Sequence, residues 1–315
     1  MPERRKVSVV GAGSVGATVA YASLIRGAAN TMALYDVDRH KVVAEVLDLN
    51  HGSQFYPTAN VIGSDDIAVT ADSDIVVITA GAKQKPGQTR LDLAAVNVEM
   101  SRSLVPKLVA LSPEAILLMV TNPVDVVTYA AVQASGLPSR RVFGSGTVLD
   151  SSRLRTLLAQ HCDVAVHSVN AFIVGEHGDS QVPAWSQAAI GGVPVRDWSP
   201  TGRPPLDEQT LDRIAHDVVT AAEQIIRGKG ATNYAVGLAA AGIVEAVLND
   251  DRSVMPVSSL LTGQYAIDDV CLSLPSIVDS QGVDVILTPP FSADEVDALR
   301  HSADTVRGVE RSLGI

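Results

Sequence analysis

Residues 6–16 read KVSVVGAGSVG, and this stretch decides the fold. The short apolar run Val7 to Val10 leads into glycines at the spacing G-x-G-x-x-G, and a helical pattern begins directly after them. Gly11 permits a tight turn, Gly13 lets the backbone approach a pyrophosphate, and Gly16 lets helix and strand pack closely. Phosphates bind well at a helix N-terminus, because backbone N–H groups point at them there. The stretch therefore predicts a dinucleotide-binding turn.

A lone glycine motif also occurs as a tight turn that binds nothing, so its surroundings matter. Asp36 follows Gly16 by about 20 residues, at the end of the second apolar run. A carboxylate at that place accepts hydrogen bonds from both ribose hydroxyls and repels a 2′-phosphate. The combination of strand, glycines and acid predicts that the chain binds NAD rather than NADP.

The first half of the chain alternates short apolar runs with longer helical patterns, as parallel strands joined by crossover helices do. The runs expected to be strands are residues 7–10, 31–35, 61–63, 75–79, 116–120 and 142–143. A full dinucleotide-binding sheet needs this number of strands. The sequence therefore predicts an α/β fold with a Rossmann doubly wound parallel sheet, the NAD-binding domain, over residues 1–145. Within it, Pro106 is expected to kink or split a helix near Arg102.

Beyond Gly146 the rhythm changes, and a second domain is predicted over residues 146–315. Helices are expected over residues 151–160, 206–227, 232–248 and 292–313, and short strands over 254–261, 270–274 and 283–287. Ser292 and Glu295 form a capping pair at the start of the last helix. This mixture predicts that a mixed α+β substrate domain follows the Rossmann domain.

Composition and charge restrict the class of protein. The 315 residues are 46% hydrophobic and carry a formal net charge of -11. An acidic surface repels phosphate, which argues against nucleic acids and anionic membranes as partners. No apolar run reaches about 18 residues, so no membrane span is expected. Only Cys162 and Cys271 occur, which gives no disulfide framework and no metal-ligand spacing. We expect a cytoplasmic protein that acts on a small molecule without a metal.

A candidate reaction site contains the residue types that hydride transfer on a hydroxy acid requires: a base, a cation for the carbonyl and an anchor for the carboxylate. His177 lies between glycines in the run GEHGDS at residues 175–180. Arg153 lies one helical turn beyond Asp150, so their side chains project to the same side. Taken singly, each residue has a plainer interpretation: a turn histidine, an exposed arginine and a helix N-cap.

The chain resembles the lactate and malate dehydrogenase family, specifically its L-lactate branch, over nearly its whole length. Besides residues 11–16, the resemblance rests on AGAKQKPGQTRL at 80–91, TNPVD at 121–125, GSGT at 144–147, LDSSRL at 149–154, GEHGDS at 175–180 and GKGAT at 228–232. It implies reversible hydride transfer between NAD and lactate or pyruvate, a step of glycolysis. Because the family is commonly tetrameric, it also implies a homotetramer.

The resemblance implies roles for individual residues. His177 is the acid/base, Asp150 pairs with its other ring nitrogen, and Arg153 holds the substrate carboxylate. Arg90 matches the lid arginine that polarises the carbonyl, and Asn122 matches the asparagine that hydrogen-bonds the substrate, although an asparagine before a proline also suits a turn. The predicted cofactor contacts are Gly11, Gly13, Val15, Gly16, Asp36, Gly81 and Asn122.

In the family that this chain resembles, one lid position determines the preferred substrate, and the matching residue in this sequence is Gln84. A malate-type member carries arginine there to pair with the second carboxylate of oxaloacetate, whereas a neutral glutamine suits the methyl group of pyruvate. Thr232 is the residue that lines the side-chain end of the pocket in lactate members. Two alternatives stay open: a dehydrogenase for malate or a bulkier 2-hydroxy acid, and a non-catalytic NAD-binding module.

The resemblance also raises the question of regulation. Bacterial members often bind fructose 1,6-bisphosphate at a subunit interface through an arginine and a histidine. Arg155 matches the arginine and is the candidate allosteric residue, but Asn170 stands where the histidine is usual. Whether the bisphosphate activates this chain is left open by the sequence.

Overall fold

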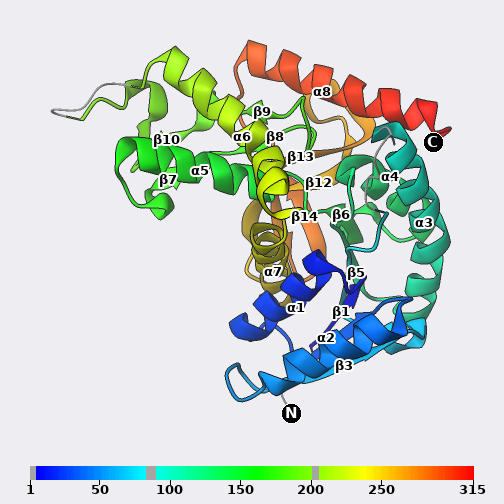
Figure 1. Ribbon diagram of the computed structural model, residues 1–315. Coiled ribbons are helices and arrows are strands. Elements are labelled where there is room, and N and C mark those ends of the chain that lie inside the picture. Colours follow the sequence, from blue (N-terminus) through cyan, green and yellow to red (C-terminus); the bar gives the residue numbers. More distant parts are fainter. Residues whose placement is uncertain (1–4, 83–89, 201–205) are drawn as a thin grey trace.

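The computed structural model describes residues 5–82, 90–200 and 206–315 and has one central sheet (Figure 1). Within these residues nine strands are ordered β14-β13-β12-β6-β5-β4-β1-β2-β3. The parallel part consists of β1 (Lys6–Val10), β2 (Thr31–Tyr35), β3 (Asn60–Ser64), β4 (Ile75–Ile78), β5 (Ile116–Met119) and β6 (Val142–Gly144). Its order is that of a doubly wound dinucleotide-binding sheet, so the predicted fold and the first strands are confirmed.

Helices cover both faces of the sheet, which explains why its strands are continuous apolar runs (Figure 1). Along β4, Ile75 and Val77 belong to one core while Val76 and Ile78 belong to the other, as alternate side chains of a strand must. The first core is covered by α1 (Ser14–Arg26), α2 (Arg39–His51) and α7 (Tyr234–Asn249). The second is covered by α3 (Arg90–Leu111), α4 (Val124–Ser135) and α8 (Ala293–Ser312).

The long strands of the second half extend this same sheet. They are β12 (Ser253–Thr262), β13 (Asp268–Asp279) and β14 (Gly282–Ile286), which pair antiparallel to one another. β12 joins β6 through the pair Ser258 and Gly144. The sheet therefore runs across the boundary predicted between residues 145 and 146, and that division stays a prediction.

A third, smaller core lies apart from the central sheet, in the upper left of Figure 1. It packs α5 (Val148–Cys162) against α6 (Glu208–Lys229) through buried side chains that include Leu158 and Leu211. The short strands beside it are β7 (Val169–Asn170), β8 (Ile173–Val174), β9 (Val182–Pro183), β10 (Ala189–Ile190) and β11 (Val193–Pro194). The connecting 3-10 turns are η1 (Ile67–Thr70), η2 (Ser139–Arg141), η3 (Val166–Ser168), η4 (Trp185–Gln187), η5 (Val195–Asp197) and η6 (Gln264–Ala266).

Two local predictions about helices meet different outcomes. Pro106 does not split its helix, because α3 runs from Arg90 to Leu111 with the proline inside. Val98 and Leu108, on either side of Pro106, pack in the same core, so burial stabilises both halves of the helix. At the start of α8 the predicted capping pair is confirmed: the Glu295 N–H donates to Ser292 Oγ at 3.3 Å, and the Ser292 N–H donates to Glu295 Oε2 at 2.9 Å.

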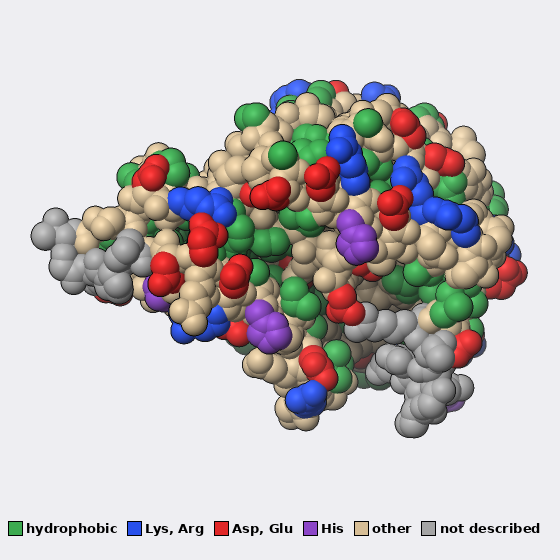
Figure 2. All heavy atoms as spheres, turned by 90° about the horizontal axis from the view of Figure 1, so that it is seen from above, with side chains coloured by type: hydrophobic (Ala, Val, Ile, Leu, Met, Phe, Trp, Pro, Cys, Tyr) green, Lys and Arg blue, Asp and Glu red, His purple; other side chains and the backbone are tan. Residues whose placement is uncertain are grey.

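The outer surface carries both signs of charge. On the face seen in Figure 2, acidic and basic side chains are interspersed, without a broad basic area. In the described parts of the chain, no helix is both long enough and apolar enough to cross a membrane.

Candidate active site

The glycine turn after β1 has the geometry that its sequence demands. Gly11 has a φ of +98°, a backbone conformation that residues other than glycine rarely adopt. Gly16 lies against the turn so closely that a Cβ there would be 1.9 Å from the Gly11 carbonyl oxygen. The first turn of α1 therefore packs directly on the end of β1, which aims the helix N-terminus at the carboxyl edge of the sheet.

The N-terminus of α1 is suited to hold an anion. Gly13 is its N-cap and provides no side-chain acceptor for the first N–H groups of the helix. A Cβ at Gly13 would have its nearest neighbour, Lys41 Nζ, at 3.7 Å, so there is space in front of the turn. Uncapped N–H donors at the positive end of a helix dipole favour a phosphate group.

Asp36 lies just past β2, beside the glycine turn. Its Oδ2 accepts from the Ala12 N–H at 2.7 Å and from Lys41 Nζ at 3.2 Å, and its Oδ1 accepts from the Asp38 N–H at 3.0 Å. Burial alone would raise the pKa of this carboxyl, but these hydrogen bonds and the Lys41 charge outweigh it and hold the pKa below its usual value. An ionised carboxylate therefore lies where a ribose hydroxyl could donate.

The ends of β4 and β5 are joined by one buried asparagine. Asn97 of α3 accepts from the Ala82 N–H at 2.8 Å and donates to the Asn122 carbonyl at 2.7 Å. Gly81 is required at this junction, since a Cβ there would lie 2.6 Å from the Thr121 side chain. The predicted residues Gly81 and Asn122 are thus held side by side at the carboxyl edge of the sheet.

The predicted residues of α5 and the GEHGDS loop meet at one carboxylate. The Nδ1 atom of His177 lies 2.6 Å from Asp150 Oδ2, and Arg153 Nη1 donates to Asp150 Oδ1 at 2.8 Å. The Asp150 side chain is only 3% exposed, whereas His177 keeps 25% and Arg153 keeps 14% of their side-chain surface. Asp150 therefore lies behind the other two and holds them toward the open side.

The helix start at this site differs from the expectation. The sequence allowed Asp150 as an N-cap ahead of Ser151, but α5 begins at Val148 with Thr147 as its N-cap. Thr147 takes that place because its backbone and side chain are bound to other elements: its N–H donates to Ser273 Oγ at 3.1 Å and its Oγ1 to the Ile173 carbonyl at 2.6 Å. Asp150 therefore lies inside the first helical turn, and its oxygens bind side chains.

The charges around His177 favour a protonated ring. Burial alone would lower the pKa of His177, but the charge and hydrogen bond of Asp150, together with the charge of Asp125, raise it above its usual value. Arg153 opposes this effect. Burial would likewise raise the pKa of Asp150, but the charge and hydrogen bond of His177 and the charge of Arg153 lower it. The pair is thus arranged to stabilise an imidazolium next to a carboxylate.

A hollow of about 120 Å³ opens beside these groups. The predicted residues Asn122, Arg153, His177 and Thr232 all line it, so the structure brings together four side chains from separate motifs. Sequence reasoning missed the other lining residues: Val120, Ser145, Gly146, Leu149, Ala222, Ile226, Val236 and Ala239. Ser145 and Gly146 belong to the GSGT motif, while the apolar members carry no signal that separates a pocket wall from a core.

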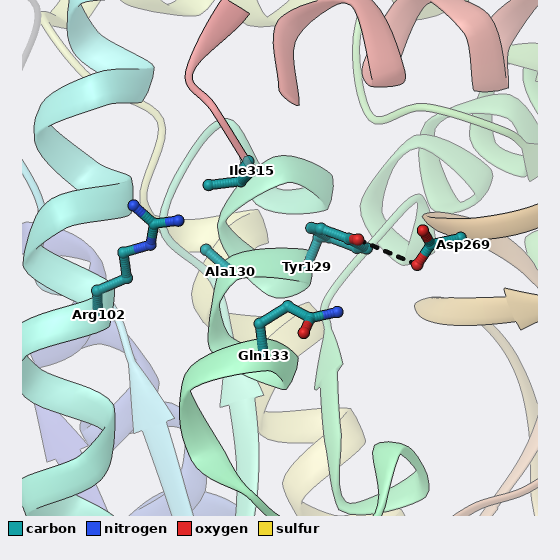
Figure 3. A pocket seen from close by; sticks show the side chains of 6 residues that line it. All are labelled: Arg102, Tyr129, Ala130, Gln133, Asp269 and Ile315. Atoms are coloured by element: carbon teal, nitrogen blue, oxygen red, sulfur yellow. Dashed lines mark hydrogen bonds between the residues drawn. The ribbon is translucent and has the colours of Figure 1, made fainter. Parts of the chain in front are cut away.

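A larger hollow of about 300 Å³ lies elsewhere, between α3, α4, β13 and the C-terminus (Figure 3). Arg102, Tyr129, Ala130, Gln133, Asp269 and Ile315 line it. Its best-defined polar contact is internal, because the Tyr129 hydroxyl donates to Asp269 Oδ1 at 3.0 Å. No residue of this hollow was predicted as a site residue, and we assign the chemistry to the smaller one.

Three further predicted residues have no described contact with this site. Gln84 lies outside the described residues. Arg90 begins α3, and its side chain lies outside what the structure describes. Arg155 is engaged within the fold: its Nε donates to the Ala171 carbonyl at 2.8 Å, and its guanidinium lies 4.9 Å from the centre of the Phe172 ring.

The fold, the glycine turn with Asp36 and the pair of His177 and Asp150 together define a class of protein. It is an α/β protein with a dinucleotide site and an acid/base pair. Comparison with known families identifies which one. Residues 5–144 match the model of the lactate/malate dehydrogenase NAD-binding domain, and residues 147–309 match the alpha/beta C-terminal domain of the same family. The chain belongs to the lactate/malate dehydrogenase family and is an NAD-dependent oxidoreductase.

Individual relatives are similar over their full length. The chain is 50% identical over 310 residues to the L-lactate dehydrogenase of Bifidobacterium animalis subsp. lactis, covering 98% of this chain and 97% of that protein. It is 44% identical to the L-lactate dehydrogenase of Acetivibrio thermocellus, covering 99% and 98%. Among solved structures, the minor L-lactate dehydrogenase from Enterococcus mundtii superposes with a TM-score of 0.94 at 39% identity, covering 98% of each chain.

Proposed function

We propose that this chain is an NAD-dependent L-lactate dehydrogenase, which interconverts L-lactate and pyruvate. The observation that carries the proposal is the meeting of His177 and Arg153 on the two oxygens of Asp150, beside a hollow that Asn122 and Thr232 also line. The relatives at 44–50% identity support the same chemistry, because they are L-lactate dehydrogenases.

His177 acts as the acid/base. When lactate is oxidised, the imidazole ring of His177 takes the proton of the C2 hydroxyl while the C2 carbon loses a hydride. NAD supplies the hydride acceptor and, as NADH, the hydride donor of the reverse reaction. Asp150 binds Nδ1 at 2.6 Å, which leaves Nε2 for the substrate and stabilises the imidazolium that forms.

Arg153 anchors the substrate carboxylate. A guanidinium has five N–H donors in a rigid fork, so its contact with Asp150 through Nη1 leaves further donors for a carboxylate. Asn122 and Thr232 line the same hollow, and we assign them contacts with the reacting oxygen and the methyl end of pyruvate. Arg90, the first residue of α3, is assigned the role of polarising the carbonyl.

The cofactor is assigned to the carboxyl edge of the sheet. The uncapped start of α1 fits the pyrophosphate, and the ionised Asp36 fits the ribose hydroxyls. Gly81 and Asn122, which lie where Asn97 joins the Ala82 N–H to the Asn122 carbonyl, would hold the nicotinamide end. The residues that we propose to hold NAD are Gly11, Gly13, Val15, Gly16, Asp36, Gly81 and Asn122.

The proposed function is tested by steady-state oxidation of NADH with pyruvate, oxaloacetate and 2-oxoisocaproate. Pyruvate is expected to give the highest kcat/KM. A higher value with oxaloacetate or 2-oxoisocaproate would overturn the lactate assignment, and no turnover with any of them would leave an NAD-binding module.

Gln84 determines the choice between pyruvate and oxaloacetate in our proposal. The substitution Gln84→Arg is expected to shift the ratio of kcat/KM toward oxaloacetate by at least about 100-fold, because a cation pairs with the second carboxylate in a closed, water-poor site. Gln88→Arg, four positions along the same run, is the matched control and should leave the ratio unchanged. An unchanged ratio in Gln84→Arg would show that residue 84 does not face the substrate.

Regulation by fructose 1,6-bisphosphate is tested by repeating the pyruvate assay with and without the effector. We propose that Arg155 is the candidate effector-binding residue, since its Nε donates to the carbonyl of Ala171, the residue that follows the exposed Asn170 of β7. Activation that Arg155→Gln abolishes would support this role. A rate that does not respond to the bisphosphate would leave Arg155 with its contacts inside the fold.

We propose that the chain assembles as a homotetramer. Large apolar side chains are exposed on α1, α2 and α7, and contact with another subunit would remove them from water. They are Tyr21, Ile25, Val43, Leu47, Tyr234 and Leu238. Light scattering is expected to give about four times the chain mass of 32.9 kDa. Leu238→Glu should give a smaller species, whereas Val285→Glu, on the exposed part of β14, should not. A tetramer that survives Leu238→Glu would exclude this face as the interface.

A cytoplasmic location and a place in glycolysis accompany the proposed reaction. Support for the location comes from the sequence, since two cysteines give no disulfide framework for an oxidising compartment.

A further inference from the structure

One buried carboxylate next to the proposed acid/base has been described above only through the effect of its charge on the pKa of His177. Asp125 lies in the first turn of α4 and is 2% exposed. Its Oδ2 accepts from the backbone N–H of His177 at 2.7 Å, and its Oδ1 accepts from the Ser258 hydroxyl at 2.6 Å. It closes the TNPVD motif, which supplied Asn122 to the site but assigned no role to its last residue.

The loop that carries His177 is held from three elements. The Gly175 N–H donates to the Ser273 carbonyl of β13 at 2.9 Å, and the Glu176 N–H donates to Ser302 Oγ of α8 at 2.8 Å. Asp125 of α4 provides the third contact, at His177 itself. The first two contacts use neutral acceptors, so a charge is not needed to hold this loop by its backbone.

Burying a charge is costly unless something uses or compensates it. Burial raises the pKa of Asp125 to about 6, against the hydrogen bonds of Ser258 and His177 and the charge of His177, which lower it. The carboxyl is therefore ionised at neutral pH. Glu176 of the same loop adds to the rise, and Asp125 in turn raises the pKa of Cys271 on β13 and of Glu310 on α8.

Asp125 and His177 act on each other as opposite charges. The charged groups that act on the His177 ring are Asp150 and Asp125, which favour its protonated form, and Arg153, which disfavours it. Asp150 makes the direct contact with Nδ1, while Asp125 acts from the backbone side of the same residue. Two carboxylates from different helices therefore act on the ring, Asp150 by direct contact and Asp125 by its charge alone.

We propose that Asp125 is a positioning residue for the proposed lactate dehydrogenase reaction: its carboxylate fixes the backbone of His177 and, as a second negative charge, favours the protonated imidazole. The inference rests on the proposed role of His177 as acid/base. Reduction of a keto acid consumes the protonated ring and oxidation of a hydroxy acid consumes the neutral ring. Asp125 therefore adds to the effect of Asp150 and raises the pH at which the protonated ring, needed for reduction, gives way to the neutral ring, needed for oxidation.

The test is the pH dependence of kcat/KM in Asp125→Asn, which removes the charge and keeps an acceptor oxygen. Without that charge the pKa of His177 falls, so the alkaline limb for pyruvate reduction should move to lower pH by about one unit. The acid limb for lactate oxidation should move in the same direction. A uniform loss of rate with unmoved limbs would mean a merely structural role and would overturn the proposal.

Ser258→Ala is the matched control, because it removes a hydrogen bond from Asp125 and keeps the carboxyl group. Loss of that bond raises the pKa of Asp125, but the carboxyl stays ionised in the alkaline range where the limb lies. Its alkaline limb for pyruvate should stay at the wild-type pH. A displacement equal to that of Asp125→Asn would show that loss of a hydrogen bond is sufficient and would contradict the role of the charge.

A measurement on the unaltered protein decides the matter if Asp125→Asn does not fold. With ¹⁵N-labelled histidine, and with His177→Ala to identify the signal, the His177 ring should titrate above its reference value and show a further inflection near pH 6, where Asp125 gains its proton. The absence of that inflection would overturn the proposal. Because this titration needs no turnover, it separates failure of this inference from failure of the proposed function.

Discussion

Replacing His177 with alanine is expected to lower kcat for pyruvate reduction by about 10²–10⁴-fold, while the affinity for NADH stays within a few-fold of wild type. The loss follows because His177, which pairs with Asp150 at 2.6 Å, is the only histidine or acidic side chain among the described residues that line the hollow. NADH binding should persist because the glycine turn and Asp36 lie on a different part of the sheet edge. Stopped-flow reduction and fluorescence titration measure the two quantities.

Two further variants make this result interpretable. Asp150→Asn should give a large but smaller loss, since the ring remains while the group that stabilises its charge is gone. His161→Ala, an exposed histidine in the last turn of the same helix, should behave as wild type. Turnover that survives in His177→Ala would remove His177 from the mechanism and would favour a different base.

Much of the fold was predictable because its signals are local. The central parallel strands β4 and β5 are short apolar runs, since they are buried on both faces, and the glycine spacing at residues 11–16 marks one turn that few other residues can form. The capping pair at Ser292 and Glu295 is equally local. Such features depend on neighbours within one or two turns of chain, and a single sequence contains them.

The parts that the sequence did not provide depend on distant contacts. The pairing of Ser258 with Gly144, which adds β12 to the central sheet, has no local signature. The start of α5 is set by Thr147, whose partners are Ser273 and Ile173, and the alternative interpretation of Asp150 as an N-cap is wrong for that reason. Local propensity gave way to tertiary contacts at both places.

The candidate site shows the same division. His177, Asp150 and Arg153 were selected by residue type and motif, and the structure brings them within hydrogen-bond distance. Asp125 was part of a motif, yet its place behind the backbone of His177 joins residues 52 positions apart and needed the fold. A motif therefore gives the residue types of a site, while the direction in which each side chain acts comes from packing.

Replacing Arg153 with leucine is expected to lower kcat/KM for pyruvate by about 10²–10³-fold, because truncating a charge-assisted pair in a partly buried site costs about 2–5 kcal/mol. Arg153→Lys tests the geometry separately, since it keeps the positive charge and loses the planar fork, and it should recover only part of the loss. Steady-state kinetics measure both, with Arg300→Leu, an exposed arginine on α8, as the control that should leave kcat/KM unchanged.

The pH profile of Arg153→Leu distinguishes an anchor from a residue that only supports Asp150. The positive charge of Arg153 lowers the pKa of His177, so removing it should raise that pKa and move the alkaline limb of the residual activity to higher pH. This direction is opposite to the one expected for Asp125→Asn, although both variants lose rate. If Arg153→Leu retains the wild-type KM and kcat for pyruvate, the substrate carboxylate is bound elsewhere. In that case the shared contact with Asp150 would be the only role left for this arginine.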